Sequence, residues 1–136
     1  MEILVEQAKG KVPVTILKLQ GELDGSNYLD VISKAKELYH AGTRDILLDM
    51  SQVNFMSSAG LVALHSIALL MRGDSPEDPE SGWEVFHAID RDRESGVQKH
   101  MKLLNPQPKV VSTLHKTGMD VFFDIHQNLQ MAISSF

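Results

Sequence analysis

Residues 47–61 read LLDMSQVNFMSSAGL and change character twice. An apolar run too short for a helix gives way, from Ser51 on, to polar residues typical of a turn. Ser57 and Ser58 then open a second apolar run of helical character. A hydroxyl is thus predicted at a helix N-terminus, where backbone N–H groups lack partners and the helix dipole is positive. Such a position suits a capping serine, a bound anion or a phosphoserine.

Composition predicts a compact module with a limited set of functions. A chain of 136 residues with 43% hydrophobic residues can bury one core but not two. The absence of cysteine excludes disulfides, thiolate catalysis and cysteine metal sites. A net charge of −5 argues against direct nucleic-acid binding, so any control of transcription would act through another protein. No signal peptide or membrane span is evident, which predicts a cytoplasmic protein that does not enter a membrane.

Hydrophobic periodicity predicts alternating strands and helices. Ile3 to Ile16 is expected to form a hairpin, and residues 26–41 an amphipathic helix ended by Gly42. Further strands are expected at 45–49, 101–104 and 121–125, and further helices at 59–72, 106–116 and 129–133. This alternation indicates an α/β fold with a mainly parallel or mixed sheet.

Two motifs carry a family resemblance. Residues 21–24 read GELD between a predicted strand and helix, and DMS at 49–51 is followed by SSAGL at 57–61. Together they resemble the STAS domain of anti-sigma factor antagonists and related bacterial regulators, from about residue 12 to the C-terminus. The resemblance implies a single α/β domain over residues 1–136, with a four- to five-stranded mixed sheet and helices packed mainly on one face. It also implies an insertion at about 73–100, where the family pattern is interrupted.

The same resemblance implies a non-catalytic signalling switch. Such a protein binds an anti-sigma factor or a related serine kinase, which carries its own nucleotide site, and serine phosphorylation ends the binding. Ser58 matches the phosphorylated serine of the family, and Ser57 is a competing acceptor because it stands where many relatives have an acid. No cofactor is expected, and a homodimer is left open. The residues expected to contact the partner are Asp24, Phe55, Met56, Ser57 and Gly60.

Other interpretations of the same residues remain open. Ser58 could simply cap its helix, and Asp24 could cap the helix that begins near Ser26. A hydrolase nucleophile elbow at Ser58 would need small residues on both sides, and Met56 does not meet that need. The six histidines lack metal-binding spacing and no phosphate-binding glycine loop occurs, so neither an enzyme nor a metal site is predicted. The alternative function is a STAS signalling module that binds a small molecule or an anion without being phosphorylated.

Overall fold

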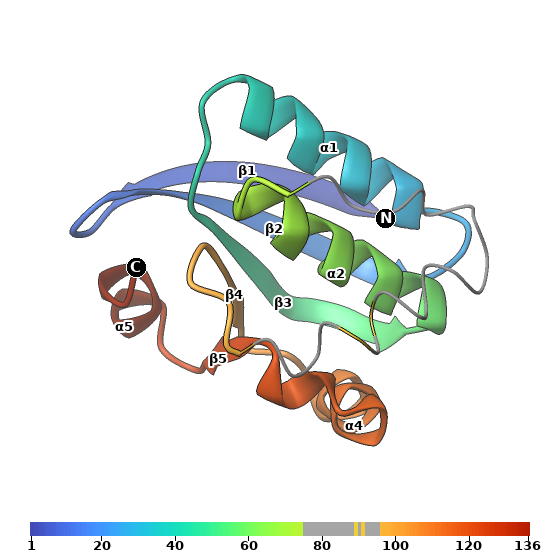
Figure 1. The fold of residues 1–136 in the computed structure, drawn as a ribbon. Coiled ribbons are helices and arrows are strands. Elements are labelled where there is room, and N and C mark those ends of the chain that lie inside the picture. The colour runs from blue at the N-terminus through green and yellow to red at the C-terminus, as the bar shows by residue number, and fades with distance from the viewer. Residues whose placement is uncertain (75–88, 90, 92–95) are drawn as a thin grey trace.

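The computed structural model describes residues 1–74, 89, 91 and 96–136, and its core is a mixed sheet. Figure 1 shows the sheet with helices packed against it. Five strands follow one another in the order β1-β2-β3-β4-β5. Their bounds are β1 Glu2–Lys9, β2 Pro13–Leu23, β3 Ile46–Met56, β4 Met101–Leu104 and β5 Asp124–His126.

The strands are joined as the alternating pattern predicted. β1 and β2 form the expected antiparallel hairpin, and each later strand lies parallel to the one before it. Parallel neighbours need long crossovers, which α1 supplies between β2 and β3. The helices described are α1 Tyr28–His40, α2 Ser58–Met71, α4 Pro108–Thr117 and α5 Leu129–Ser134, with a 3₁₀ turn, η1, at Met119–Val121.

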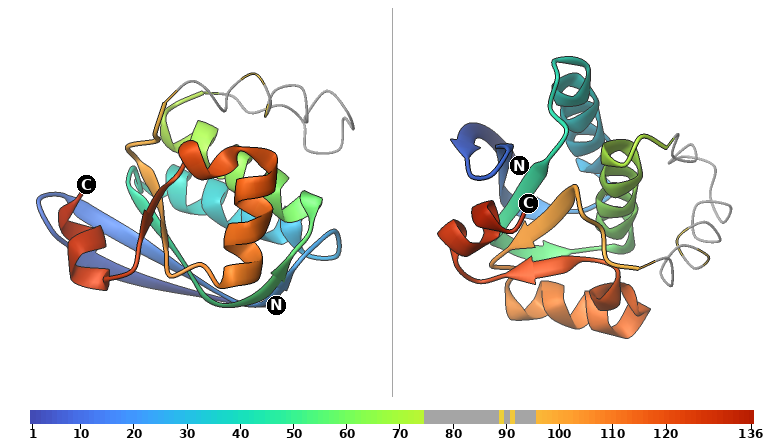
Figure 2. Two further views of the ribbon diagram at one scale, coloured as in Figure 1. Left: turned by 90° about the horizontal axis from the view of Figure 1, so that it is seen from below. Right: turned by 60° about the vertical axis from the view of Figure 1, so that its left-hand side comes forward.

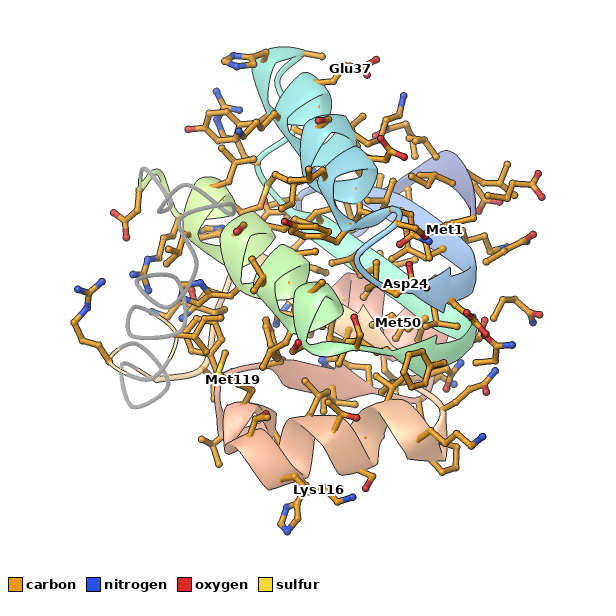
Figure 3. The ribbon with its side chains drawn as sticks, turned by 90° about the vertical axis from the view of Figure 1, so that its right-hand side faces the viewer. Met1, Asp24, Glu37, Met50, Lys116 and Met119 are labelled. Carbon is orange, nitrogen blue, oxygen red and sulfur yellow. The ribbon has the colours of Figure 1, made fainter. Side chains whose placement is uncertain are left out.

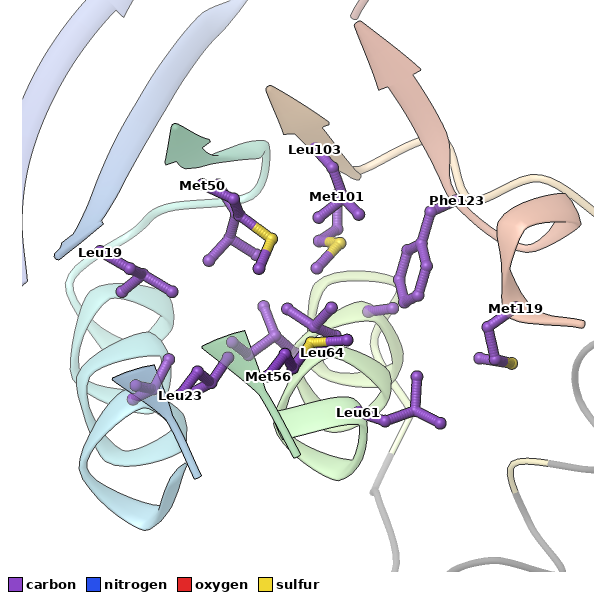
Figure 4. Close-up of a cluster of buried hydrophobic side chains, with 14 of the residues drawn as sticks. Leu19, Leu23, Met50, Met56, Leu61, Leu64, Met101, Leu103, Met119 and Phe123 are labelled. Carbon is purple, nitrogen blue, oxygen red and sulfur yellow. The ribbon is translucent and has the colours of Figure 1, made fainter. Parts of the chain in front are cut away.

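The two faces of the sheet are covered unequally, which confirms helices mainly on one face. The larger buried cluster joins alternate strand residues such as Leu19, Met50 and Leu103 to α1, α2 and α4. Figure 4 shows part of this cluster. The smaller cluster lies on the residues that point the other way, such as Leu47, and is closed by α5. Figure 2 shows α1 and α2 well separated from α5. Alternation along the strands therefore sorts the side chains into these two clusters.

One expected turn is a strand. Residues 51–56, predicted as a polar loop, continue β3 and pair with the end of β2. The prediction failed because Val53 and Met56 are buried although Ser51, Gln52 and Asn54 in the same segment are polar, and burial rather than composition sets the local structure. Register shifts after Lys18 and Gly21 let the pairing continue. The longer β3 carries its end out to the start of α2.

The strand expected at 121–125 is also wrong in its bounds. Phe122 and Phe123 are both buried while Val121 is exposed, so burial does not alternate there as it would along a strand. The chain instead makes the η1 turn and enters β5 only at Asp124. Hydrophobic content alone could not separate these two outcomes.

The predicted insertion at 73–100 falls largely outside the described residues, and its role stays a prediction. One residue of it that is described, Ile89, is 5% exposed and belongs to the larger cluster. Among the helices that the structure describes, none has the length and apolar character needed to cross a membrane.

A buried lysine ties α5 to the sheet. Lys102 is 6% exposed, and its Nζ donates to the backbone oxygen and the Oγ of Ser135, each at 3.0 Å. The same ammonium lies 3.0 Å from Asp124 and 4.9 Å from the centroid of the Phe136 ring. Burial alone would raise the pKa of Asp124, but hydrogen bonds from His126 and Lys102 outweigh it and lower that pKa. α5 is therefore held on the smaller cluster by the Lys102 ammonium, whose charge is balanced by Asp124, as well as by apolar contacts.

Stability should consequently fall in acid partly through Asp124. Its pKa is lower in the folded protein than the usual 3.8, so the ionised carboxylate stabilises the fold above pH 3.8, and this is lost as the pH falls through the folded-state pKa. Between about pH 6 and about pH 3, Asp124→Asn should lose less free energy of unfolding than the wild type. Urea unfolding at both pH values measures this. Asp30→Asn, at an exposed position of α1, is the control, and equal acid sensitivity of all three proteins would contradict the assignment.

Candidate functional site

The candidate residues lie at the end of the sheet where β2 and β3 finish. Leu23 and Met56 are register partners at the ends of these strands, and the backbone N–H of Ser57 donates to the oxygen of Leu23 at 2.9 Å. The segments leading into α1 and α2 are thereby held side by side (Figure 3). α4 begins close to the same strand, because Gln107 Nε2 donates to the backbone oxygen of Ser51 at 2.8 Å. Open α/β sheets commonly place their sites at such an end.

The two serines at the start of α2 occupy different environments. Ser57 is the N-cap residue, and Ser58 is the first residue of the helix. The interpretation of Ser58 as the cap is therefore wrong, and the Ser57 side chain makes no capping hydrogen bond either. The Oγ of Ser57 is buried without a hydrogen-bond partner among the described residues, whereas Ser58 is exposed. The first turn of α2 also contains no acidic residue, so no carboxylate occupies the positive end of its dipole.

Asp24 organises the turn between β2 and α1. Its Oδ1 accepts hydrogen bonds from the Oγ of Ser26 at 2.6 Å and from the backbone N–H of Ser26 at 2.9 Å. These two bonds, the hydroxyl one foremost, lower the pKa of Asp24. Asn27 is the N-cap residue of α1 and accepts from the backbone N–H of Asp24. The carboxylate of Asp24 is thus not a helix cap, and it stays ionised at the molecular surface.

Gly60 and Met56 pack in the interior beneath the site, where α2 meets β2. Both are buried. A Cβ atom built on Gly60 would lie 2.4 Å from Met56 Cγ and 3.0 Å from both the Cγ and the backbone oxygen of Leu23. Such distances leave no room for a side chain, so glycine lets the first turn of α2 approach β2. Of the residues expected to contact the partner, Asp24 and Phe55 are accessible, the Oγ of Ser57 is buried, and Met56 and Gly60 are buried as whole residues.

A pocket that the sequence did not predict adjoins the serines. It has a volume of about 400 Å³ and lies between the end of β3 and the outer face of α4. Phe55, 46% exposed, forms one side of this β3–α4 pocket. Its remaining lining residues are Met56, Pro108, Lys109, Ser112, Thr113 and Lys116. Surface lysines on an amphipathic helix carry no signal by themselves, and only the fold brings them next to β3.

Comparison with protein families decides the identity of the fold. The model of the STAS domain matches residues 6–72, which include both sequence motifs and the whole of α2. Over residues 6–72 the chain is a STAS domain. A search of curated proteins finds no match for this chain.

Solved structures share the fold of this STAS domain at low sequence identity. An anti-sigma factor antagonist from Mycobacterium paratuberculosis is 19% identical with a TM-score of 0.69, over 98% of this chain and 92% of that chain. The anti-sigma factor antagonist SpoIIAA in its unphosphorylated form is 18% identical with a TM-score of 0.62, over 97% and 93%. The Bacillus cell fate determinant SpoIIAA in the phosphorylated form is 17% identical with a TM-score of 0.54, over 97% and 96%. At these identities the likeness concerns the fold.

The packing at Gly60 predicts a strong effect on stability. Gly60→Ala should destabilise the STAS domain by about 1–3 kcal/mol, because the added methyl group collides with the buried Met56 side chain and crowds Leu23. Gly25→Ala is the matched control, since a Cβ there meets no atom within 4 Å. Urea unfolding of the two variants measures the difference. If both variants unfold like the wild type, α2 does not depend on this close approach.

Proposed function

We propose that this STAS domain is a non-catalytic switch controlled by phosphorylation of Ser58. Its unphosphorylated form binds an anti-sigma factor or a related serine kinase in the bacterial cytoplasm, and the phosphate releases that partner. Transcription would then be regulated through the partner. The observation that carries the proposal is the position of Ser58, exposed at the first residue of α2. Related folds known from an anti-sigma factor antagonist in unphosphorylated and phosphorylated forms support it.

The start of α2 suits a phosphate without loss of the fold. A phosphate brings about −1.5 to −2 charges, and unpaired backbone N–H groups at a helix N-terminus stabilise such a group. The first turn of α2 has no acidic residue that would repel it. Ser58 is exposed, and its side chain has no hydrogen bond to any described residue that phosphorylation would break. Phosphorylation should therefore change the surface and leave the core as it is.

Accessibility favours Ser58 over Ser57 as the acceptor. A kinase must bring the attacking hydroxyl to its bound nucleotide, which requires an exposed side chain. The Oγ of Ser57 is buried, and its backbone N–H is already engaged by Leu23. Phosphorylation there would first require the buried hydroxyl to become accessible. Ser57 thus remains the competing phosphate acceptor that the sequence suggests, but its phosphorylation needs a structural change that phosphorylation of Ser58 does not.

The surroundings of Ser58 explain how a phosphate would release a partner. Phe55 offers an exposed apolar contact and Asp24 an exposed carboxylate held by Ser26. A partner that fits these groups and a neutral hydroxyl would have to desolvate a dianion after phosphorylation. Asp24 already supplies one negative charge nearby, which adds to the repulsion of any acidic group on the partner.

Serine variants separate binding from stability. Ser58→Ala should fold, bind the kinase that phosphorylates the wild type, and accept no phosphate, at a stability cost within about 0.5 kcal/mol. Ser58→Asp should be as stable as the wild type or gain about 0.3–1 kcal/mol, because a carboxylate suits the helix N-terminus, yet it should bind poorly. Mass spectrometry of phosphorylated protein and calorimetric titration with the kinase measure these effects.

Ser57→Ala is the control for the position of the acceptor. It should keep phosphorylation and stability, since the hydroxyl it removes has no partner among the described residues. Phosphate that persists in Ser58→Ala but disappears in Ser57→Ala would move the acceptor by one residue. If neither serine accepts phosphate in protein isolated from its native cell, the switch is refuted and a ligand-binding module takes its place.

Two variants of Asp24 test whether its charge contributes to binding. Asp24→Asn keeps an oxygen that can accept from Ser26, and Asp24→Ala keeps neither the charge nor the acceptor. If the charge matters, both should weaken kinase binding to a similar extent while melting temperatures change little. If only Asp24→Ala weakens it, the turn and not the charge is required. Unchanged affinity in both would remove Asp24 from the interface.

A further inference from the structure

All charged residues that line the β3–α4 pocket are positive, a feature that the phosphorylation switch does not require. None of its lining residues is acidic, and Lys109 and Lys116 are both exposed. In the part of the chain that the structure describes, neither ammonium group has a carboxylate partner.

The charge on α4 is also distributed differently from that on α1. α4 has no acidic residue, whereas α1 combines Asp30 and Glu37 with its lysines, one of which pairs with Glu37 at 3.4 Å. Lys109 and Lys116 lie seven residues apart, which places them on one face of α4 and about 10 Å apart along it. Acidic neighbours lie outside the pocket: Glu22 is the register partner of Phe55, and Asp120 pairs with His115.

The pocket combines this charge with apolar surface. Phe55 is 46% exposed, Pro108 is exposed, and the buried Met56 forms part of the lining. Ser112 is exposed at the same place, and its hydroxyl has no hydrogen bond within the part of the chain that the structure describes. An occupant that matches the pocket therefore carries carboxylates for the lysines and an apolar side chain for Phe55.

The pocket and Ser58 lie within the footprint of one partner. Met56 lines the pocket and precedes Ser58 by two residues, so their Cα atoms are at most about 7 Å apart. A standard interface covers about 800 Å² on each protein, which corresponds to a patch far wider than this separation. Any protein bound over Ser58 would also meet the outer face of α4.

We propose that the β3–α4 pocket is the second contact surface for the serine kinase, which inserts an acidic segment with an apolar side chain between Phe55 and the two lysines. This rests on the function proposed above. It also explains how a phosphate on Ser58 could weaken a partner contact that it does not touch. A phosphate on Ser58, two residues after Met56, would add negative charge beside the pocket and would oppose the positive potential that attracts the acidic segment.

Charge reversal tests the pocket. Lys109→Glu/Lys116→Glu should weaken binding of a purified kinase that phosphorylates Ser58 by at least about tenfold, mainly through a slower association rate. Raising the salt concentration should weaken binding of the wild type more than that of this variant. The matched control is Lys9→Glu/Lys11→Glu, which makes the same charge change at the exposed hairpin turn beyond the other end of β2. It should change the affinity less than about threefold because those lysines lie outside the footprint.

The outcomes separate this proposal from the switch on which it rests. Equal effects of the two double variants, or no effect of the α4 variant, would overturn the pocket as a docking surface. If Ser58→Asp also binds like the wild type, or no kinase phosphorylates the chain, the switch fails with it. Amide NMR shifts at Lys109 and Lys116 on titration with inorganic phosphate, together with unchanged kinase binding of the α4 variant, would make the pocket a small-anion site and refute the docking surface. Retained thermal unfolding of both double variants excludes misfolding as the cause.

Discussion

The parallel pairing of β2 with β3 determines where Ser58 and Asp24 lie relative to each other. The pairing continues through two register shifts to Leu23 and Met56, so both strands finish together. The hydrogen bond between Ser57 and Leu23 then fixes the start of α2 beside the turn that holds Asp24. If the strands separated earlier, the helix would begin without a backbone anchor and the two motifs of the family would no longer share a surface.

The sequence predicted the elements that have a clear period or a strong stop signal. The hairpin, the amphipathic α1 and α4 with its left-handed Gly118 all follow from such local signals. It failed where burial contradicts polarity. Residues 51–56 are polar enough for a loop, yet β2 offers them a pairing edge and the core accepts Val53 and Met56. Pairing across a sheet is a tertiary effect, and no window of local sequence contains it.

The candidate site divides in the same way. Both serines could be located near a helix start from the local pattern, but their roles could not be separated by sequence, because a shift of one residue decides which is buried. The lysines of α4 were not predicted at all. They lie 51 and 58 positions from Ser58 in the chain, and only the order of the strands places α4 beside the end of β3.

The tight contact between Gly60 and Leu23 has a consequence for any genetic screen of this domain. A selection for partner binding would reject substitutions at position 60 as strongly as those at a true contact, although the residue is buried. If positions were ranked by fitness alone, the most sensitive ones would include buried residues that support the interface without contacting the partner. Measuring protein abundance in the same library would separate the two groups, because substitutions at buried supporting residues lower the amount of folded protein and substitutions at surface contacts do not.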